Sequence, residues 1–237
     1  MAAKQELPGK QYRHELKYVI TEGEHKLLST RIKACLKQDY HASKNGGEYF
    51  IRSLYFDDPF DTALWEKASG TGSRDKFRIR IYNMQDDAIK LERKHKEGQY
   101  IKKDSVSLSR QDCDEIVHGK FECLRHNESP FAMQFYGILL SNHLRPKVLV
   151  DYTREPYVFP AEDVRITFDK NVRTAMRCTD LFNPNVITYP VWDLTNCMIL
   201  EVKFNESMPQ YVQELLTLGS AQRTAASKYV FCRQYEF

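Results

Sequence analysis

A strict alternation of basic and apolar residues runs through residues 76–82, KFRIRIY. A period of two is typical of a β-strand with one buried face and one polar face. Residues 88–94, AIKLERK, repeat this alternation, and the polar stretch 83–87 between the two predicts a hairpin loop. The two polar faces should therefore lie side by side. They carry Lys76, Arg78, Arg80, Lys90, Glu92 and Lys94.

The charge of this paired face is its unusual feature, because five of its six residues are cationic. One interpretation is the solvent face of an ordinary half-buried sheet, since charged side chains usually face water. However, like charges that lie opposite each other destabilise a sheet, and a surface that serves only solubility mixes both signs. A cationic ladder is better explained by an anion that lies across it.

Strands with a charged face beside an apolar one recur along the chain. They are expected over residues 11–20, 100–108, 163–169 and 197–204, with further strands over 48–56 and 147–156. Helices are expected between them. Thr21 with Glu24 forms a capping box at the start of one, and Ser109 with Asp112 caps the start of another. A longer helical stretch is expected within residues 121–142, and a last helix within 227–235.

The short helices need an apolar surface to pack on, and the apolar faces of the strands provide one. If the sheet closes, its charged faces line the inside, the helices pack outside, and no strand edge is exposed. The fold class that we predict is therefore α+β, a closed antiparallel β-barrel with a polar, cationic lumen and helices packed outside. Residues 1–10 are expected to form a flexible N-terminal arm, and residues 11–237 a single domain.

Composition limits the possible partners. The 237 residues include 35 Lys and Arg and 32 Asp and Glu, a net charge of +3, so any anion site must be local. The near-neutral charge also argues against nucleic-acid binding, although basic strands with aromatic residues can bind single strands. No apolar run is long enough for a transmembrane segment and no signal segment is recognised, so a soluble, cytoplasmic protein is expected. The six Cys residues are scattered, which favours free thiols over zinc.

Lumen cations at this density would repel one another unless they bind something of opposite sign. The cationic majority therefore implies a polyphosphate-like ligand. The minority carboxylates, Glu15, Glu92 and Glu201, imply a divalent metal held partly by that ligand. Mn²⁺ or Mg²⁺ suits such a site, because these ions bind few protein carboxylates together with phosphate oxygens and water.

Eight short motifs in order give the chain a resemblance to a known family. They are RHELKY at 13–18, SLYFDD at 53–58, KFRIRIY at 76–82, LERK at 91–94, DYTREPY at 151–157, RITFD at 165–169, LEVKF at 200–204 and SKY at 227–229. Together they resemble the VTC domain, the polyphosphate polymerase domain of the triphosphate tunnel metalloenzyme superfamily. The resemblance implies an eight-stranded antiparallel tunnel. It also implies transfer of the γ-phosphoryl group of ATP to a growing polyphosphate chain, with ATP and inorganic polyphosphate as partners.

The resemblance also assigns roles to individual residues. The catalytic residues that it implies are Arg78, Arg80, Lys94, Arg154 and Arg165. The further phosphate-binding residues are Lys17, Lys67, Arg74, Lys103, Lys203 and Lys228. Glu201 would be the metal ligand, with Glu15 and Glu92 as further candidates.

One position departs from the superfamily's pattern. The hydrolase branch has a Glu-x-Glu-x-Lys motif in its first strand, where this chain has Arg13, Glu15 and Lys17. The missing acidic position weakens a triphosphatase or cyclase interpretation and favours the polymerase branch. Two alternatives stay open, a non-catalytic polyphosphate-binding module and a triphosphate hydrolase. The choice between Mn²⁺ and Mg²⁺ and the oligomeric state also stay open.

Overall fold

The computed structural model describes residues 14–98, 100–159, 164–205, 207–217 and 224–234, so the predicted arm over residues 1–10 lies outside the described part. The strands are β1 (His14–Thr21), β2 (Lys37–Gln38), β3 (Tyr49–Asp57), β4 (Ser73–Tyr82), β5 (Gln85–Glu97), β6 (Tyr100–Leu108), β7 (Arg145–Phe159), β8 (Val164–Met176), β9 (Tyr189–Pro190) and β10 (Cys197–Phe204). The helices are α1 (Glu22–Cys35), α2 (Tyr40–Ser43), α3 (Thr62–Ala68), α4 (Arg110–Val117), α5 (Glu122–Arg125), α6 (Pro130–Ser141), the 3₁₀ turn η2 (Trp192–Leu194), α7 (Gln210–Leu215) and α8 (Lys228–Arg233).

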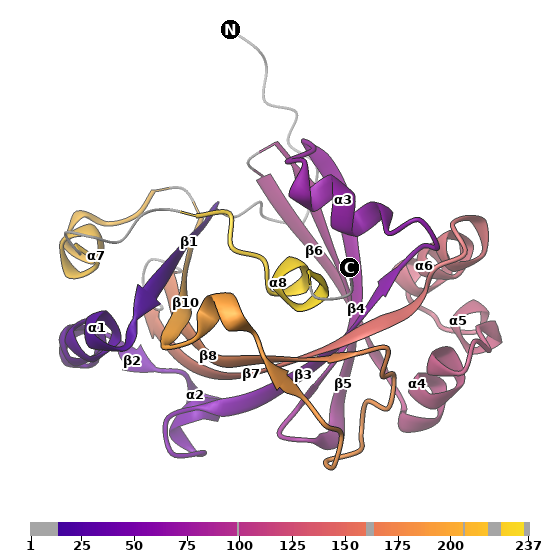
Figure 1. Cartoon of the computed structure of the whole chain (residues 1–237), viewed down its shortest axis with the longest axis horizontal. Coiled ribbons are helices and arrows are strands. Elements are labelled where there is room, and N and C mark those ends of the chain that lie inside the picture. The colour runs from indigo at the N-terminus through magenta and orange to yellow at the C-terminus, as the bar shows by residue number, and fades with distance from the viewer. Residues whose placement is uncertain (1–13, 99, 160–163, 206, 218–223, 235–237) are drawn as a thin grey trace, which may run out of the picture.

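Eight strands form one continuous antiparallel path, in the order β1-β10-β8-β7-β3-β4-β5-β6. The short strands β2 and β9 pair with β7 and β8 and extend the sheet to ten strands. The sheet curls strongly, so that β4, β5 and β6 face β1, β10 and β8 across a central space (Figure 1). The predicted antiparallel, β-rich architecture is therefore confirmed.

The predicted closure of the barrel is wrong, because β1 and β6 stand at the two ends of the path and form no ladder with each other in the described residues. Side chains occupy the space between the two edges. The rings of His14 in β1 and Tyr100 in β6 lie 6.4 Å apart. The Lys94 Nζ of β5 donates to both carboxylate oxygens of Glu15 in β1, at 2.6 and 2.7 Å. Side-chain contacts rather than backbone hydrogen bonds therefore bridge this half-barrel.

The hairpin between β4 and β5 is tighter than the pattern predicts. Only Asn83 and Met84 form the turn, with φ of 49° and 59°, and Tyr82 already pairs with Gln85. Two-residue turns with both φ values positive match the right-handed twist of the flanking strands. Residues 85–87 belong to the strand. They are polar because this end of the strand is exposed to solvent, and not because it forms a loop.

Most helices cover the convex face of the sheet, as expected. Both caps are present, and α1 packs Leu28 and Ile32 against the outer side of β8 and β10. Helices α4, α5 and α6 cover the outer side of β3 to β6 (Figure 1). The helical stretch expected within residues 121–142 is two helices, because the second starts afresh with Pro130 in its first turn.

Helix α8 is different, because it packs on the concave face. The inward positions of β3 and β7 are apolar at one end, where Ile51, Val148 and Val150 lie in a cluster with Tyr229 and Cys232 of α8. Figure 1 shows α8 inside the curl, between β8 and β4. The concave face is therefore divided into an apolar end filled by α8 and a charged end that stays open.

A cationic cavity as the candidate active site

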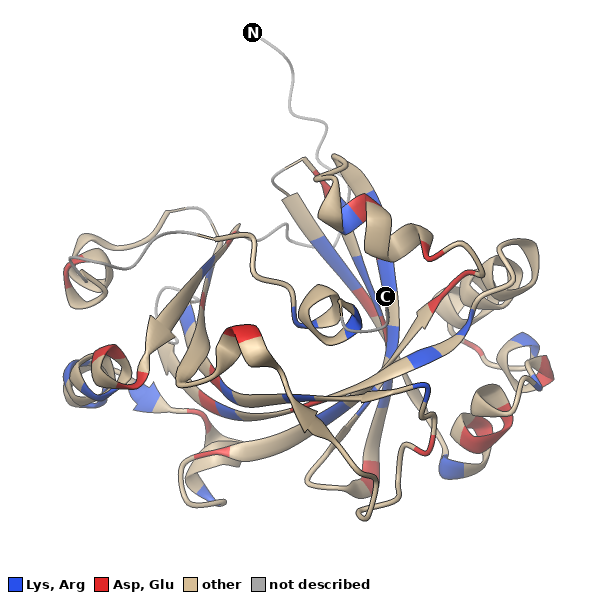
Figure 2. Ribbon diagram, viewed as in Figure 1, with Lys and Arg blue, Asp and Glu red and all other residues tan. Residues whose placement is uncertain are grey.

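The charged end of the concave face forms a cavity of about 1080 Å³, at the upper end of the roughly 300–1000 Å³ typical of small-molecule sites. Its thirty lining residues include fifteen Lys and Arg but three Glu. Figure 2 shows Lys and Arg recurring along the strands that surround this space. All fourteen predicted site residues line this one cavity: Glu15, Lys17, Lys67, Arg74, Arg78, Arg80, Glu92, Lys94, Lys103, Arg154, Arg165, Glu201, Lys203 and Lys228. The structure thus brings them together, and their binding roles stay predictions.

Strand register explains how residues far apart in sequence meet here. Alternate side chains of a strand point to one face, so paired inward positions on neighbouring strands form rows. One row runs from Arg78 in β4 to Glu92 in β5. On the opposite wall, Glu201 in β10 pairs with Lys17 in β1 on one side and with Thr167 in β8 on the other.

Glu92 collects the cations of the β4–β6 wall. Its carboxylate lies 2.6 Å from Nη2 of Arg78 and 3.9 Å from Nη1 of Arg80, and it also binds the Lys103 ammonium. Burial alone would raise the pKa of Glu92, but Arg78, Arg80 and Lys103 together hold it well below its usual range. Glu92 therefore stays ionised and keeps three cations in place.

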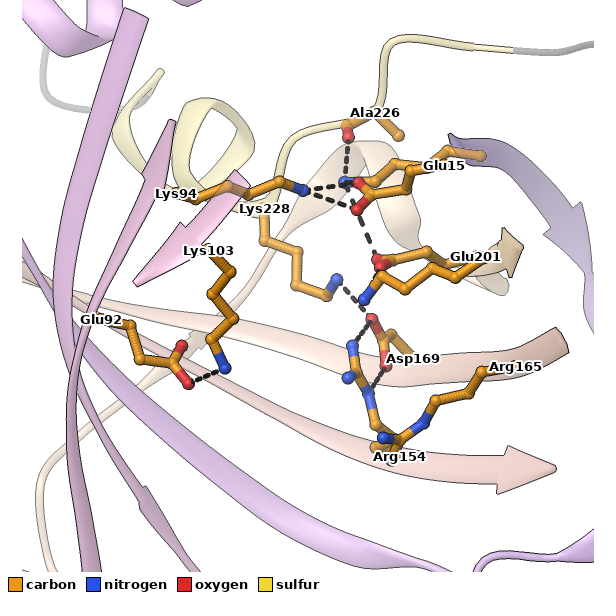
Figure 3. Close-up of polar contacts among 12 residues, drawn as sticks. Glu15, Glu92, Lys94, Lys103, Arg154, Arg165, Asp169, Glu201, Ala226 and Lys228 are labelled. Atoms are coloured by element: carbon orange, nitrogen blue, oxygen red, sulfur yellow. Dashed lines mark hydrogen bonds and ion pairs between the residues drawn. The ribbon is translucent and has the colours of Figure 1, made fainter. Parts of the chain in front are cut away.

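Glu15 and Glu201 form a second carboxylate group on the opposite wall (Figure 3). The Lys17 Nζ lies between them, 3.2 Å from Glu15 and 3.8 Å from Glu201, while Lys203 also binds Glu201. Burial and the neighbouring Glu201 raise the pKa of Glu15, yet Lys94, Lys17 and Lys203 lower it to about 2. Two carboxylates thus remain ionised side by side because ammonium groups surround them.

Asp169 is a site residue that sequence reasoning missed. It is fully buried and accepts from Nε and Nη2 of Arg154 at 2.6 and 2.8 Å, and it also pairs with Lys228 (Figure 3). Burial opposes its charge, but Arg154 and Lys228 keep its pKa below the usual range. Its place on the charged face with Arg165 and Thr167 was visible in the alternation of RITFD. Its two partners come from β7 and α8, which no local pattern joins to it.

Four cations lie at the end of the cavity near α3 and the hairpin of β5 and β6: Lys67, Arg74, Lys76 and Lys96. Within the described residues no ion pair joins them to an Asp or Glu, unlike the cations described above. Burial lowers the pKa of Lys76 well below its ordinary value, and Lys17, Lys67 and Lys94 lower it further. Burial together with Arg74 lowers the pKa of Lys67 to about 8. We name these four residues the mouth cluster.

Two buried polar atoms on β8 point to a ligand with oxygen atoms. Within the described residues, Nε of Arg165 and Oγ1 of Thr167 have no hydrogen-bond partner. Buried polar groups are normally hydrogen-bonded, so each such exception calls for an explanation. Arg165 otherwise donates to Asp39 and Tyr49, at 3.3 and 3.2 Å. Both atoms flank Glu201 and Lys203 in the register, where an anion would meet them.

The three predicted metal ligands do not gather at one point. Glu15 and Glu201 share Lys17, whereas Glu92 lies across the cavity with Lys103 (Figure 3). In the described part of the chain no group of three His, Cys, Asp or Glu could hold a metal ion. Two adjacent carboxylates still fit Mg²⁺ or Mn²⁺, since such ions bind one or two carboxylates and complete their shell with phosphate oxygens and water. The donor set therefore fits a metal that arrives with a phosphate ligand.

The family comparison matches the VTC domain over residues 12–237. The chain belongs to the VTC domain family. The match covers nearly the whole chain, so the resemblance carried by the eight motifs is confirmed at the level of the family. Comparison with curated proteins gives no significant match. In the described residues no helix of this VTC domain has the length and apolar character needed to cross a membrane.

Solved structures show the same fold at low sequence identity. A candidate adenylyl cyclase from Hippeastrum, with a dominant triphosphatase activity, is 15% identical, with a TM-score of 0.56 over 95% of this chain and 96% of that one. A candidate adenylate cyclase from Bacillus halodurans is also 15% identical, with a TM-score of 0.51 over 88% of this chain and 89% of that one. The curled sheet of this VTC domain is therefore shared with these two proteins.

Proposed function

We propose that this VTC domain is a metal-dependent ATP–polyphosphate phosphotransferase of the triphosphate tunnel metalloenzyme superfamily. It would transfer the γ-phosphoryl group of ATP to a growing inorganic polyphosphate chain. The observation that carries the proposal is the single cavity in which fifteen Lys and Arg face three Glu. The family match and the triphosphatase activity reported for the Hippeastrum protein support the same class of substrate.

The side chains of the cavity match what phosphoryl transfer requires. Catalysis of this reaction is mostly positioning and neutralisation of the charge on the transferred group. The planar guanidinium groups of Arg78, Arg80 and Arg154 can each grip two phosphate oxygens, while lysines act as point charges. The carboxylates fix these cations before substrate arrives, so little reorganisation is needed on binding. The acceptor is itself an anion and needs no general base.

Glu201 and Glu15 are the residues that would hold Mn²⁺ or Mg²⁺, and the metal would supply charge neutralisation at phosphate oxygens. Lys17 and Lys203 already balance these carboxylates, so they would turn toward the phosphate when the metal is bound. Glu92, apart from this pair, is better suited to orienting Arg78 and Lys103 than to binding metal. We assign it that orienting role in place of its predicted metal role.

The decisive experiment incubates the purified protein with ATP and Mn²⁺, and with Mg²⁺ in parallel, and follows ADP release and polyphosphate length on a gel. Chain growth that stops in Glu201→Ala is the expected result. The matched control is Glu97→Ala, whose side chain is 66% exposed and lies outside the cavity. Circular dichroism verifies that both variants fold.

The same gel separates the alternatives. ADP and free phosphate without chains would replace the polymerase with a triphosphate hydrolase. Binding of added polyphosphate without any turnover would replace it with a non-catalytic binding module. Chain growth at the wild-type rate in Glu201→Ala would refute the assigned role of that carboxylate.

A further inference from the structure

Helix α8 joins the charged cavity to the apolar end of the concave face. Its first residue, Lys228, extends into the cavity, where it pairs with Asp169 and lies 4.7 Å from the ring centroid of Tyr152. The next residue, Tyr229, is 2% exposed, belongs to the apolar cluster beneath the helix and also lines the cavity. The boundary between the two regions thus falls at Tyr229.

Tyr229 is fixed by contacts on both sides. Its hydroxyl donates to the carboxylate of Asp57 and accepts a hydrogen bond from Nη1 of Arg233 at 2.8 Å. Asp57, at the end of β3, also accepts from the backbone N–H groups of Ala63 and Leu64 at the start of α3, at 3.0 and 3.2 Å. Tyr229 therefore ties α8 to the junction of β3 and α3.

The ring of Tyr229 supports a cavity arginine through one intermediate. It stacks on the ring of Tyr55, with centroids 5.0 Å apart and an interplanar angle of 29°. The Tyr55 hydroxyl accepts from Nη1 of Arg78 at 2.8 Å, while Nη2 and Nε of Arg78 bind Oε2 of Glu92 at 2.6 and 2.8 Å. Two side chains thus hold Arg78, and one of them, Tyr55, stacks on Tyr229.

We propose that Tyr229 is a positioning residue for Arg78. Through the stack it holds Tyr55, and through Tyr55 it aims the Arg78 guanidinium into the cavity. Its hydroxyl is bound to Asp57 and Arg233 and its ring stacks on Tyr55, so it would act on a phosphate through Arg78. The proposal rests on the proposed function in one respect, that Arg78 contacts a triphosphate group.

The physical basis is the rigidity of a buried aromatic pair. Stacked rings are stabilised by about 0.5–1.5 kcal/mol beyond their area burial, and a buried arginine with two fixed partners loses little entropy when it grips an anion. Without the ring of Tyr229, Tyr55 would gain freedom and Arg78 would keep only Glu92. Nη1, the guanidinium nitrogen that Tyr55 holds, would then lose its fixed direction toward the cavity.

The test is a double-mutant cycle with inorganic triphosphate as the probe, measured by titration calorimetry without turnover. Arg78→Ala should weaken binding by roughly tenfold or more, as expected for loss of charged hydrogen bonds. Tyr229→Leu should weaken it by roughly three- to tenfold, the equivalent of the stacking contribution. If Tyr229 acts through Arg78, Tyr229→Leu should have no further effect in the Arg78→Ala background.

Tyr157→Phe is the matched control. Tyr157 is 1% exposed and its hydroxyl also donates to a buried carboxylate, that of Glu155, but it lies outside the cavity. The Tyr157→Phe substitution should lower the thermal unfolding temperature without changing the affinity for triphosphate. If Tyr229→Leu does not fold, Tyr55→Phe enters the same cycle, because it keeps the stacked ring and removes the hydroxyl that accepts from Arg78.

Each outcome decides one question. Additive effects of Tyr229→Leu and Arg78→Ala would overturn the positioning role, even if the wild type extends polyphosphate. Non-additive effects in a protein that binds triphosphate but grows no chains would support the positioning role and refute the polymerase proposal. Failure of the wild type to bind triphosphate would overturn both.

Discussion

Two buried arginine–aspartate pairs on neighbouring strands make an instructive comparison. Arg52 of β3 binds Asp151 of β7 through Nε and Nη2, both at 2.8 Å. Arg154 of β7 binds Asp169 of β8 through the same two atoms, at 2.6 and 2.8 Å. All four residues are at most 7% exposed. By geometry and burial alone the two pairs could not be told apart.

Their surroundings separate them. Arg52 also donates to the backbone carbonyls of Leu181 and Asn183, at 3.5 and 2.7 Å, and faces away from the cavity. Asp169, in contrast, binds a second cation, Lys228, and its partner Arg154 lines the cavity. The first pair balances one charge with one charge, while the second leaves a positive excess. In this fold, a buried ion pair therefore indicates an anion-binding site only where positive charge exceeds negative charge.

The largest expected effect is on stability. Asp169→Ala and Asp151→Ala each leave buried cations without their carboxylate, so each should lower the free energy of unfolding by about 3–5 kcal/mol. Added triphosphate should separate the two variants, because a phosphate can replace the carboxylate of Asp169 but cannot reach Arg52. The ligand-induced rise in unfolding temperature should therefore be larger for Asp169→Ala than for wild type, and unchanged for Asp151→Ala. Equal rises in all three proteins would contradict the comparison.

The second prediction concerns the shape of the guanidinium. Arg154→Lys keeps the charge but loses two-point binding, and should weaken triphosphate binding by roughly tenfold. Arg52→Lys makes the same chemical change outside the cavity and should lower stability while leaving affinity unchanged. Calorimetric titration of both variants measures the affinity for triphosphate, and thermal unfolding measures their stability. An affinity loss in Arg52→Lys would show that the two pairs are not functionally distinct.

Much of this comparison lies beyond what the sequence predicts. The alternation in residues 76–82 and 197–204 predicted strands and inward charges, because period two is a local property of the backbone. Closure was predicted wrongly, since the meeting of β1 and β6 depends on the accumulated twist and curl of eight strands. The inward position of α8 was missed for a related reason. It follows from the apolar positions Ile51, Val148 and Val150 on a face that the charged strands suggested was polar throughout.

The site shows the same division between local and distant information. The fourteen predicted residues carry recognisable motifs or alternate with apolar neighbours, and they meet in one cavity. Asp169 could not be selected because its partners, Arg154 and Lys228, are 15 and 59 residues away along the chain. The division of the carboxylates into Glu92 on one wall and Glu15 with Glu201 on the other depends on register across the whole sheet. No single strand contains that information.

A third prediction uses pH to test Lys67 of the mouth cluster. Lys67 has a pKa of about 8, so it should lose its charge near pH 8 and triphosphate affinity should fall as pH rises through 8. The free energy of unfolding, in contrast, should rise with pH. The folded state binds fewer protons than the unfolded state between pH 8 and the ordinary lysine pKa of 10.5, so this group raises stability with pH in that window.

Lys67→Met should weaken both trends, and the remainder is expected from Lys94, whose pKa burial also lowers to about 8. The affinity of the variant for triphosphate should fall by roughly two- to fivefold at pH 7, as for a single partly exposed charge. The measurement is a series of titrations and thermal unfolding curves from pH 7 to 9.5. If the affinity of the wild type for triphosphate increases as the pH rises above 8, the charge of Lys67 does not contribute to binding.

The smallest expected effect tests whether position on a cationic strand face suffices for binding. Lys90 shares the face of Arg80 and pairs with it in the register, but its Nζ donates to Ser107 at 2.6 Å and it does not line the cavity. Lys90→Ala should therefore change triphosphate affinity by less than about twofold. Lys76→Ala, from the same hairpin, should weaken binding by roughly fivefold, because Lys76 lines the cavity and belongs to the mouth cluster. Equal losses in the two variants, measured by titration at low salt, would mean that the ligand responds to the overall field of the hairpin and not to the cavity.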